Sequence, residues 1–283
     1  MIKHLIKALI FIAAFTGMAV FSRKQTDGFK ICKISSNFSF HPEWEVPPLP
    51  EPELFFVKQA LAQPFSYMGK GSQAFVFVSE DQNYVLKLIR YNHITPSLWT
   101  QLTSQEKCQA LNAKLARDFT SYKIAYEALK EETGVIFLHL NKTDLFHQKL
   151  VIVDKIGIAH TLDLDQTEFI LQKRAEPFYP HLQNLMIRSQ EEEAKHLVSH
   201  LISLLFNQYK QGIVNTDVDL FKNFGCLEKE VIELDVGSLK KEASPQDQTH
   251  YREEIRRVTD CLHNRLSQDY PSLDAHLLKE LEQ

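Results

Sequence analysis

Acidic and amide side chains gather in the last third of this sequence. Asp217, Asp219 and Asn223 lie in a polar stretch, and Asp235 follows a run with the apolar residues Val231, Ile232 and Leu234. The apolar run predicts a strand that ends at Asp235. An acid that orients a hydroxyl, with an amide oxygen and a second acid that bind a cation, is the set that a magnesium–nucleotide site requires. The alternative is a solvated turn, because acidic loops with Asn and Gly are common.

A second candidate region contains two glycines beside predicted strands. Gly69, Gly71 and Ser72 precede residues 74–79, which together with residues 84–90 predict a β-hairpin. Glycines at such a place let backbone amides approach a phosphate closely. A plain turn is the other interpretation, since Gly-x-Gly alone is a weak signal.

The second strand of this hairpin carries one lysine among apolar residues. Val85 and Ile89 project to the same face as Lys87, whereas Leu86 and Leu88 project to the other face. An unpaired buried ammonium group is costly, so a buried Lys87 requires a carboxylate or a ligand phosphate as its partner. The alternative is an edge strand from which the lysine side chain reaches solvent.

A predicted helix over residues 104–132 supplies acidic partners for Lys87. Its apolar residues recur at three- and four-residue spacing, and Gly134 predicts its end. We expect Glu127 to pair with Lys87, with Glu106 as the second choice. Either acid can also be a solvated surface charge.

The remaining segments predict the elements that position these residues. Pro177 and Pro180 mark a boundary between a mainly β first part and a helical second part. Ser189 and Glu192 have the spacing of a capping box, and Gly212 predicts the end of the helix that they begin. The predicted elements are strands at 149–155 and 167–173, and helices at 189–211, 251–268 and 271–281.

The N-terminal residues predict a targeting segment followed by a linker. Residues 1–24 contain a mostly apolar run between basic flanks, which is typical of a secretory signal or an uncleaved signal-anchor. Such a segment predicts export or membrane anchoring, with the side of the membrane left open. Residues 25–53 are rich in proline and predict an extended linker, so the folded part is expected at 54–283.

Composition narrows the classes of function. The chain has 283 residues and a formal net charge of −4, with no long basic run, which gives no support to nucleic-acid binding. The four cysteines, Cys32, Cys108, Cys226 and Cys261, are too far apart to indicate a zinc site or a disulfide framework.

The order of these features resembles the protein-kinase-like superfamily. A glycine loop, a strand lysine, a long helix, an acidic loop with asparagine and an Asp-x-Gly sequence follow one another over roughly residues 67–240. The resemblance implies a two-lobed α+β fold. The N-lobe would be an antiparallel sheet with one long helix at about 54–173, and the C-lobe would be mainly helical at about 174–283.

The resemblance implies ATP and Mg²⁺ as cofactors. Gly69, Gly71 and Ser72 stand where the glycine-rich loop covers the nucleotide phosphates. Lys87 stands where a strand lysine contacts those phosphates, and Glu127 would hold it.

The same resemblance implies the catalytic and metal-binding residues. Asn215-Thr-Asp217 stands where His-Arg-Asp is usual, so Asp217 would be the catalytic base. Asp217 is one residue further from Asn223 than the family spacing, and Asp219 is one residue too near, so Asp219 is an alternative base. Asn223 and Asp235 would bind Mg²⁺.

The sequence also departs from the family beyond Asp235. Too few residues follow for a full C-terminal lobe, and no Ala-Pro-Glu sequence appears. We therefore expect a divergent phosphotransferase that acts on an unknown acceptor. The alternative is an inactive pseudokinase that serves as an exported or membrane-anchored binding module for a protein partner.

Overall fold

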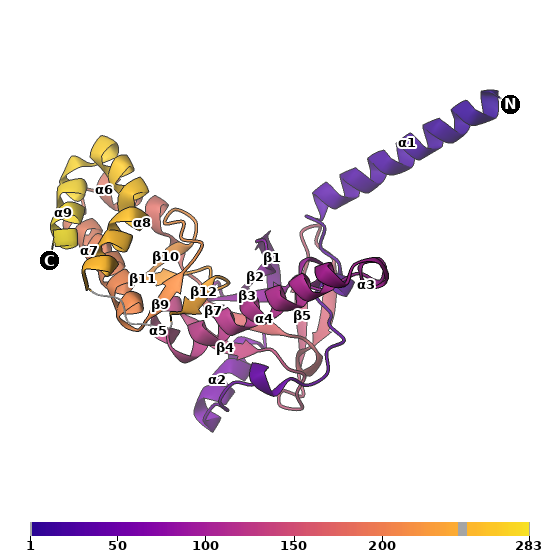
Figure 1. The fold of residues 1–283 in the computed structure, drawn as a ribbon, viewed down its shortest axis with the longest axis horizontal. Helices are drawn as coiled ribbons and strands as arrows, with labels where there is room; N and C mark the ends of the chain where they lie inside the picture. Colours follow the sequence, from indigo (N-terminus) through magenta and orange to yellow (C-terminus); the bar gives the residue numbers. More distant parts are fainter. Residues whose placement is uncertain (1, 243–247, 283) are drawn as a thin grey trace. The chain divides into compact units, whose positions relative to one another are not determined.

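The computed structural model describes residues 2–242 and 248–282, and the chain forms two compact units (Figure 1). Unit 1 contains Met1–Leu111 and His139–Leu171, and unit 2 contains Asn112–Leu138 and Gln172–Gln283. Unit 1 is rich in strands and unit 2 in helices, so the predicted α+β class is confirmed. Residues 112–138, which we expected in the first lobe, cluster with unit 2.

Unit 1 is built around a sheet of mainly antiparallel strands. Strands β1–β2, β2–β3 and β5–β6 pair antiparallel, and β1–β5 pair parallel, in the order β7-β3-β2-β1-β5-β6. The predicted hairpin is confirmed to within one residue. The strands are β1 (Phe65–Lys70), β2 (Ala74–Ser79), β3 (Tyr84–Ile89), β5 (Lys149–Val153), β6 (Ala159–Asp163) and β7 (Phe169–Lys173), and the helices are α1 (Ile2–Gln25), α2 (Glu51–Ala60) and α3 (Leu98–Thr103).

The β2–β3 hairpin has two faces that differ in their surroundings. Lys87 pairs with Val76 across the strands and is half-buried on one face. Phe75 and Phe77 project to the opposite face, because successive side chains of a strand alternate. Phe29 covers that opposite face, with its ring centroid 5.1 Å from Phe75 and 5.5 Å from Phe77. Only the face with Lys87 therefore lies away from this N-terminal segment.

The segment 25–53, which we expected to be a linker, contains residues that pack onto unit 1. Ile34 and Trp44 are buried. The backbone amide of His41 donates to the Asn141 side chain at 3.0 Å, and that side chain donates back to the carbonyl of His41 at 2.8 Å. These contacts use aromatic and polar side chains that a proline count does not register.

Unit 2 combines helices with a three-stranded sheet, in the order β11-β10-β8, and the strand pair β12–β9. Its core consists mainly of side chains from α6, α7, α8 and α9. Helix α4 begins in unit 1 and continues in unit 2. The helices are α4 (Gln105–Glu127), α5 (Lys130–Thr133), α6 (Phe178–Ile187), α7 (Glu191–Lys210), α8 (Gln248–Asp269) and α9 (Pro271–Glu282), and the strands are β4 (Val135–His139), β8 (Glu176–Pro177), β9 (Ile213–Asn215), β10 (Phe224–Leu227), β11 (Glu230–Glu233) and β12 (Leu239–Lys241).

Helix α7 does not begin with the predicted capping box. Ser189 has a φ of 59°, and Gln190 occupies the N-cap position without a side-chain hydrogen bond. An N-cap serine needs an extended backbone, so the prediction for Ser189 is wrong. The predicted end of the helix is confirmed, because Gly212 has the positive φ of 67° that is typical of a helix C-terminus.

Helix α1 is the segment predicted as a signal or an anchor. Every α1 side chain that the structure describes is exposed. Within residues 2–242 and 248–282, no helix combines the length and the apolar character needed to cross a bilayer.

Candidate functional site

The loop with Asp217 and Asn223 is bonded to the segment with Asp235. The Asn223 side chain donates to the carbonyl of Asp217 at 2.8 Å. The carbonyl of Asn223 accepts from the amide of Leu234 at 2.6 Å, and Leu234 immediately precedes Asp235. One asparagine therefore connects the two acid-bearing segments, as the sequence pattern requires.

The buried Glu233 supports the loop that contains Asp217 through hydrogen bonds. Asn215 donates from its side-chain nitrogen to Glu233 and accepts from the backbone amide of Asp217 at 2.8 Å. Gln208 of α7 donates to the other carboxylate oxygen of Glu233 at 2.6 Å. These residues fix the backbone of Asp217 where the family pattern has His and Arg. We did not predict Glu233, although a single acid inside an apolar run is a usable signal.

Asp217 and Asp219 have different environments. The Asp219 carboxylate binds Lys222 at 2.6 Å and accepts from the amide of Phe221 at 3.0 Å. The Lys222 hydrogen bond, against some opposing desolvation, lowers the pKa of Asp219. Asp217 is exposed and lines a cavity of about 630 Å³ together with Arg257 and other residues of unit 2. Asp219 therefore stabilises the turn, whereas Asp217 faces a space large enough for a small ligand.

Helix α4 holds the backbone around Asp235. The Ser121 hydroxyl donates to the carbonyl of Val236 at 2.6 Å and accepts from the amide of Leu239 at 2.6 Å. Asp235 itself is exposed, and its carboxylate accepts from the amide of Gly237 at 3.1 Å. The turn is thus fixed on both sides of a carboxylate that points to solvent. Ser121 lies more than a hundred residues before Asp235, which is why no local pattern revealed it.

Two further α4 side chains lie close enough to Asp235 to interact with its charge. Asp118 is buried and its carboxylate lies 2.5 Å from the Lys114 ammonium group. Burial raises the pKa of Asp118 more than Lys114 lowers it, and the charge of Asp235 adds to the rise. Burial also raises the pKa of Tyr122, and the charges of Asp118 and Asp235 contribute. A cation at Asp235 would relieve this repulsion.

The predicted partner of Lys87 has another contact. Glu127 lies 3.7 Å from Lys123 in an i,i+4 ion pair within unit 2. Lys87 lies on β3 of unit 1, and Glu106 lies in the first turn of α4. The pairing of Lys87 with Glu127 or Glu106 stays a prediction.

The space beside the backbone of Gly69 and Gly71 is open. A side-chain carbon at Gly69 would meet no atom within 4 Å, and at Gly71 the nearest atom would be the carbonyl oxygen of Ala74 at 3.9 Å. Strand β1 has a register shift between Tyr67 and Gly69, and Ser72 follows in the turn to β2. Packing within the chain therefore does not require the two glycines. The open space suits the approach of a ligand to the backbone.

Magnesium is the cation that the resemblance implies for the oxygen atoms of Asn223 and Asp235. Among the residues described, no group of three or more His, Cys, Asp or Glu side chains is placed to hold a metal ion. Mg²⁺ usually binds one or two protein carboxylates and completes its shell with phosphates and water. Asn223 and the exposed Asp235 supply oxygen ligands of this kind. They fit Mg²⁺ that arrives with a nucleotide, and not an all-protein cage.

Several solved structures of WbdD are similar to this chain. No protein-family model and no curated protein matches the sequence. WbdD with a kinase inhibitor is 16% identical, with 76% of this chain and 45% of that chain covered and a TM-score of 0.35. Monomeric WbdD is 16% identical, with 75% of this chain and 45% of that chain covered and a TM-score of 0.36. The bifunctional kinase-methyltransferase WbdD is 14% identical, with 74% of this chain and 43% of that chain covered and a TM-score of 0.33. This chain thus spans less than half the length of the WbdD chains, and the residue roles rest on the contacts within it.

Proposed function

We propose that this chain is a divergent kinase-like protein that binds ATP with Mg²⁺ and transfers a phosphoryl group to an acceptor hydroxyl. The observation that carries the proposal is the bonding of Asn223 to both acid-bearing segments of unit 2. Through it, the backbone of Asp217 and the residue before Asp235 keep a fixed relation. A base and a metal ligand must be held in this way for phosphoryl transfer, in which positioning and charge stabilisation dominate catalysis.

Each acid of unit 2 has a role that its environment supports. Asn223 and Asp235 would hold Mg²⁺, because they present oxygen atoms from a braced loop and a braced turn. Bound Mg–ATP supplies the phosphoryl group and the cation that neutralises charge on it. Asp217 would orient the acceptor hydroxyl and take its proton. We favour Asp217 over Asp219, because the Asp219 carboxylate is already bonded within its turn.

Unit 1 would bind the phosphates. The backbone amides around Gly69, Gly71 and Ser72 have open space for a phosphate, and Lys87 would contact the phosphate oxygens from β3. An acid of α4 would hold this lysine in position. Glu127 is the first choice for this acid and Glu106 is the second.

Thermal unfolding of the purified chain with ATP and Mg²⁺ tests the proposal. We expect stabilisation by the nucleotide that requires Mg²⁺ and disappears in Asp235→Asn, because a ligand that binds only the folded state raises the unfolding temperature. Asp219→Asn is the matched control, since it removes one acid of the same region without removing a metal ligand. An absent shift at saturating nucleotide, or an equal shift in Asp235→Asn, would contradict nucleotide binding at this site.

A second candidate function is nucleotide binding without transfer. The observation that favours it is Lys222, whose charge in the acidic loop is already compensated by Asp219. A loop that neutralises its own lysine has less positive charge to stabilise a transferred phosphoryl group. Formation of ADP from ATP separates the two functions: ADP formation that Asp217→Asn abolishes supports transfer. Mg²⁺-dependent binding with no ADP formed supports a pseudokinase that acts as a binding module.

A further inference from the structure

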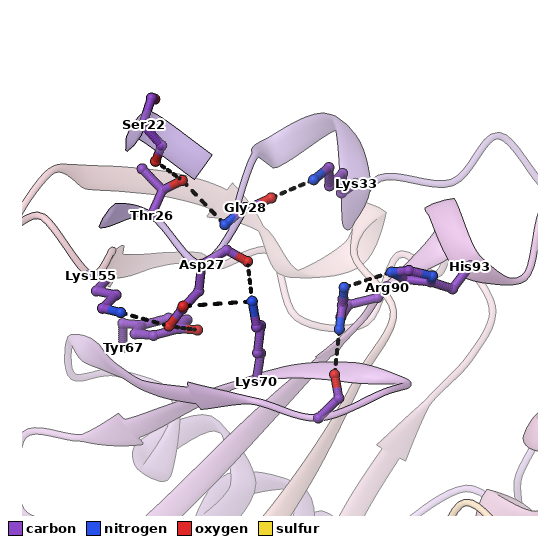
Figure 2. A network of polar contacts seen from close by, with 11 residues as sticks. Ser22, Thr26, Asp27, Gly28, Lys33, Tyr67, Lys70, Arg90, His93 and Lys155 are labelled. Atoms are coloured by element: carbon purple, nitrogen blue, oxygen red, sulfur yellow. Dashed lines mark hydrogen bonds and ion pairs between the residues drawn. The ribbon is translucent and has the colours of Figure 1, made fainter. Parts of the chain in front are cut away.

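Four cations lie together where helix α1 ends. Arg23 belongs to the last turn of α1, Lys30 and Lys33 follow it, and Arg90 follows strand β3. A side-chain carbon at Gly28 would lie 3.3 Å from the Lys33 nitrogen and 3.7 Å from Arg23 Cγ, so these two side chains converge on one backbone position. Figure 2 shows Lys33 beside Gly28 and Arg90 beside His93. We name Arg23, Lys30, Lys33 and Arg90 the basic cluster.

The side chains of the basic cluster repel one another. Burial lowers the pKa of Lys33, and the charges of Arg23, Lys30 and Arg90 lower it further. Lys33 donates to a backbone carbonyl at 2.5 Å, and Arg90 donates to the carbonyl of Gly71. The Arg90 Nε is buried without a hydrogen-bond partner. Among the described residues, none of these four cations forms an ion pair with a carboxylate. An anion placed there would reduce the repulsion between them.

The residues between α1 and the cluster are fixed to the sheet. The Asp27 carboxylate accepts from the Tyr67 hydroxyl at 3.1 Å and from Lys155 at 2.9 Å (Figure 2). Lys70 of strand β1 donates to the Asp27 carbonyl at 3.0 Å. Phe29 also packs on the face of the hairpin that carries Phe75 and Phe77. Together with the Asp27 network, this contact fixes the segment that contains Lys30 and Lys33 before any ligand binds. The negative charge of Asp27 is therefore compensated by Lys155 and Lys70.

Helix α1 exposes apolar side chains on every side. The consecutive residues Leu9, Ile10, Phe11 and Ile12 are 58–72% exposed. Four consecutive residues point around the whole circumference of a helix, which has 3.6 residues per turn. A groove on a protein covers one side of such a helix and would leave the apolar side chains of its other sides in water.

Helix α3 adds a second exposed apolar element to unit 1. Leu98, Trp99 and Leu102 are 80%, 75% and 83% exposed. The helix follows the short turn Tyr91–His93, in which His93 accepts from Arg90 at 2.6 Å. Tryptophan is enriched where proteins meet lipid headgroups. The apolar residues of α3 therefore follow Arg90, one member of the basic cluster, closely in the chain.

We propose that the basic cluster binds the phosphates of anionic lipids in a bilayer that α1 and α3 also contact. Basic residues at the end of an apolar segment are attracted to the negative surface of a membrane, and apolar side chains gain from burial beside the headgroups. The proposal does not require α1 to cross the bilayer. It is independent of the proposed kinase-like function, because its residues are neither the phosphate-binding glycines nor the acids of unit 2.

Binding of the full chain to vesicles tests the proposal. We expect it to sediment with phosphatidylcholine vesicles that contain phosphatidylglycerol, and much less with phosphatidylcholine alone. Replacing Arg23, Lys30 and Lys33 together by Gln should weaken binding roughly a hundredfold at low salt, since each cation near the surface contributes about 1 kcal/mol. The matched control replaces Lys58, Lys149 and Lys229 by Gln, which changes the net charge equally and should leave binding unchanged.

A second variant and an optical signal keep the test independent of folding. Arg23→Gln with Lys30→Gln alters only exposed side chains and should still weaken binding at least tenfold. Trp99 is exposed and Trp44 is buried, so a blue shift of fluorescence on vesicle binding should disappear in Trp99→Phe. Equal binding to neutral vesicles, equal loss in the lysine control, or equal displacement by inorganic phosphate at matched phosphate concentration would overturn the proposal.

Discussion

Two aspartates, one in each unit, show how surroundings separate a structural acid from a candidate ligand. The Asp165 carboxylate accepts from the Thr143 hydroxyl at 2.8 Å and from the backbone amides of residues 145–147 at 2.7–2.9 Å. These bonds outweigh burial and lower its pKa to about 2. The exposed Asp235 carboxylate accepts from the Gly237 amide. A carboxylate surrounded by donors of its own chain holds a loop, whereas one exposed in a braced turn has oxygen atoms left for a cation.

The largest effect that this contrast predicts is on catalysis. Asp235→Asn should reduce phosphoryl transfer about a thousandfold, because it weakens the metal ligand that stabilises charge in the transition state. Its free energy of unfolding should change by less than about 1 kcal/mol, since the side chain is exposed. ADP formation and urea unfolding measure the two quantities. If Asp235→Asn unfolds readily but keeps its turnover per folded molecule, Asp235 has a structural role like that of Asp165 and the prediction is wrong.

Asp165→Asn should show the opposite pattern. The folded-state pKa of about 2 lies below the ordinary 3.8, so ionised Asp165 stabilises the fold above pH 3.8, and this contribution is lost as the pH falls toward 2. We expect the variant to lose about 2 kcal/mol at neutral pH and much less near the lowered pKa. Urea unfolding across this pH range measures the difference. A loss that does not change with pH would mean that the hydrogen bonds, and not the charge, stabilise the loop.

A third prediction concerns the α4 support of the Asp235 turn. Ser121→Ala removes one donor and one acceptor from buried backbone groups and should cost about 1–2 kcal/mol of stability. It should also reduce the Mg²⁺-dependent stabilisation by ATP, because the turn is then held less firmly. Ser199→Ala, which removes a serine bonded to His276 at 2.8 Å, is the control. Equal nucleotide effects in both variants would show that Ser121 does not position the site.

Local sequence predicted the parts of the fold that depend on neighbouring residues. Alternating side chains located the β2–β3 hairpin, and the glycine at 212 located the end of α7. The same reasoning failed at Ser189, because a positive φ replaced the extended backbone that a cap requires. Composition also predicted an extended linker where Trp44 is buried. A proline count does not register the ring contacts of Trp44 with Phe38 and His41, or the hydrogen bonds of His41 to Asn141.

The candidate site was predictable in its exposed residues and not in its supports. Asn223 and Asp235 were predicted because loop acids and amides stand out beside an apolar run, and their role as metal ligands stays a prediction. Glu233 and Ser121 were missed because their role arises from hydrogen bonds to residues that the chain brings together only on folding. Burial also distinguishes Asp118 from the other acids of its helix. The pattern of charges along a sequence does not show which of them are buried.

The smallest predicted effects separate Asp118 from Glu127, two of the three acids of α4. Burial raises the pKa of Asp118, so the stability that this group contributes is fully present below pH 3.8 and is lost as the pH rises through the raised value. Asp118→Asn should therefore flatten the dependence of unfolding free energy on pH and weaken nucleotide binding.

Glu127→Gln should change stability by only about 0.3–0.5 kcal/mol, because its pair with Lys123 is a partly exposed i,i+4 contact. Urea unfolding and Mg²⁺-dependent ATP binding measure both variants. A stronger loss of ATP binding in Glu127→Gln than in Asp118→Asn would favour Glu127 as the acid that holds Lys87, because loss of a surface pair alone would not alter nucleotide affinity.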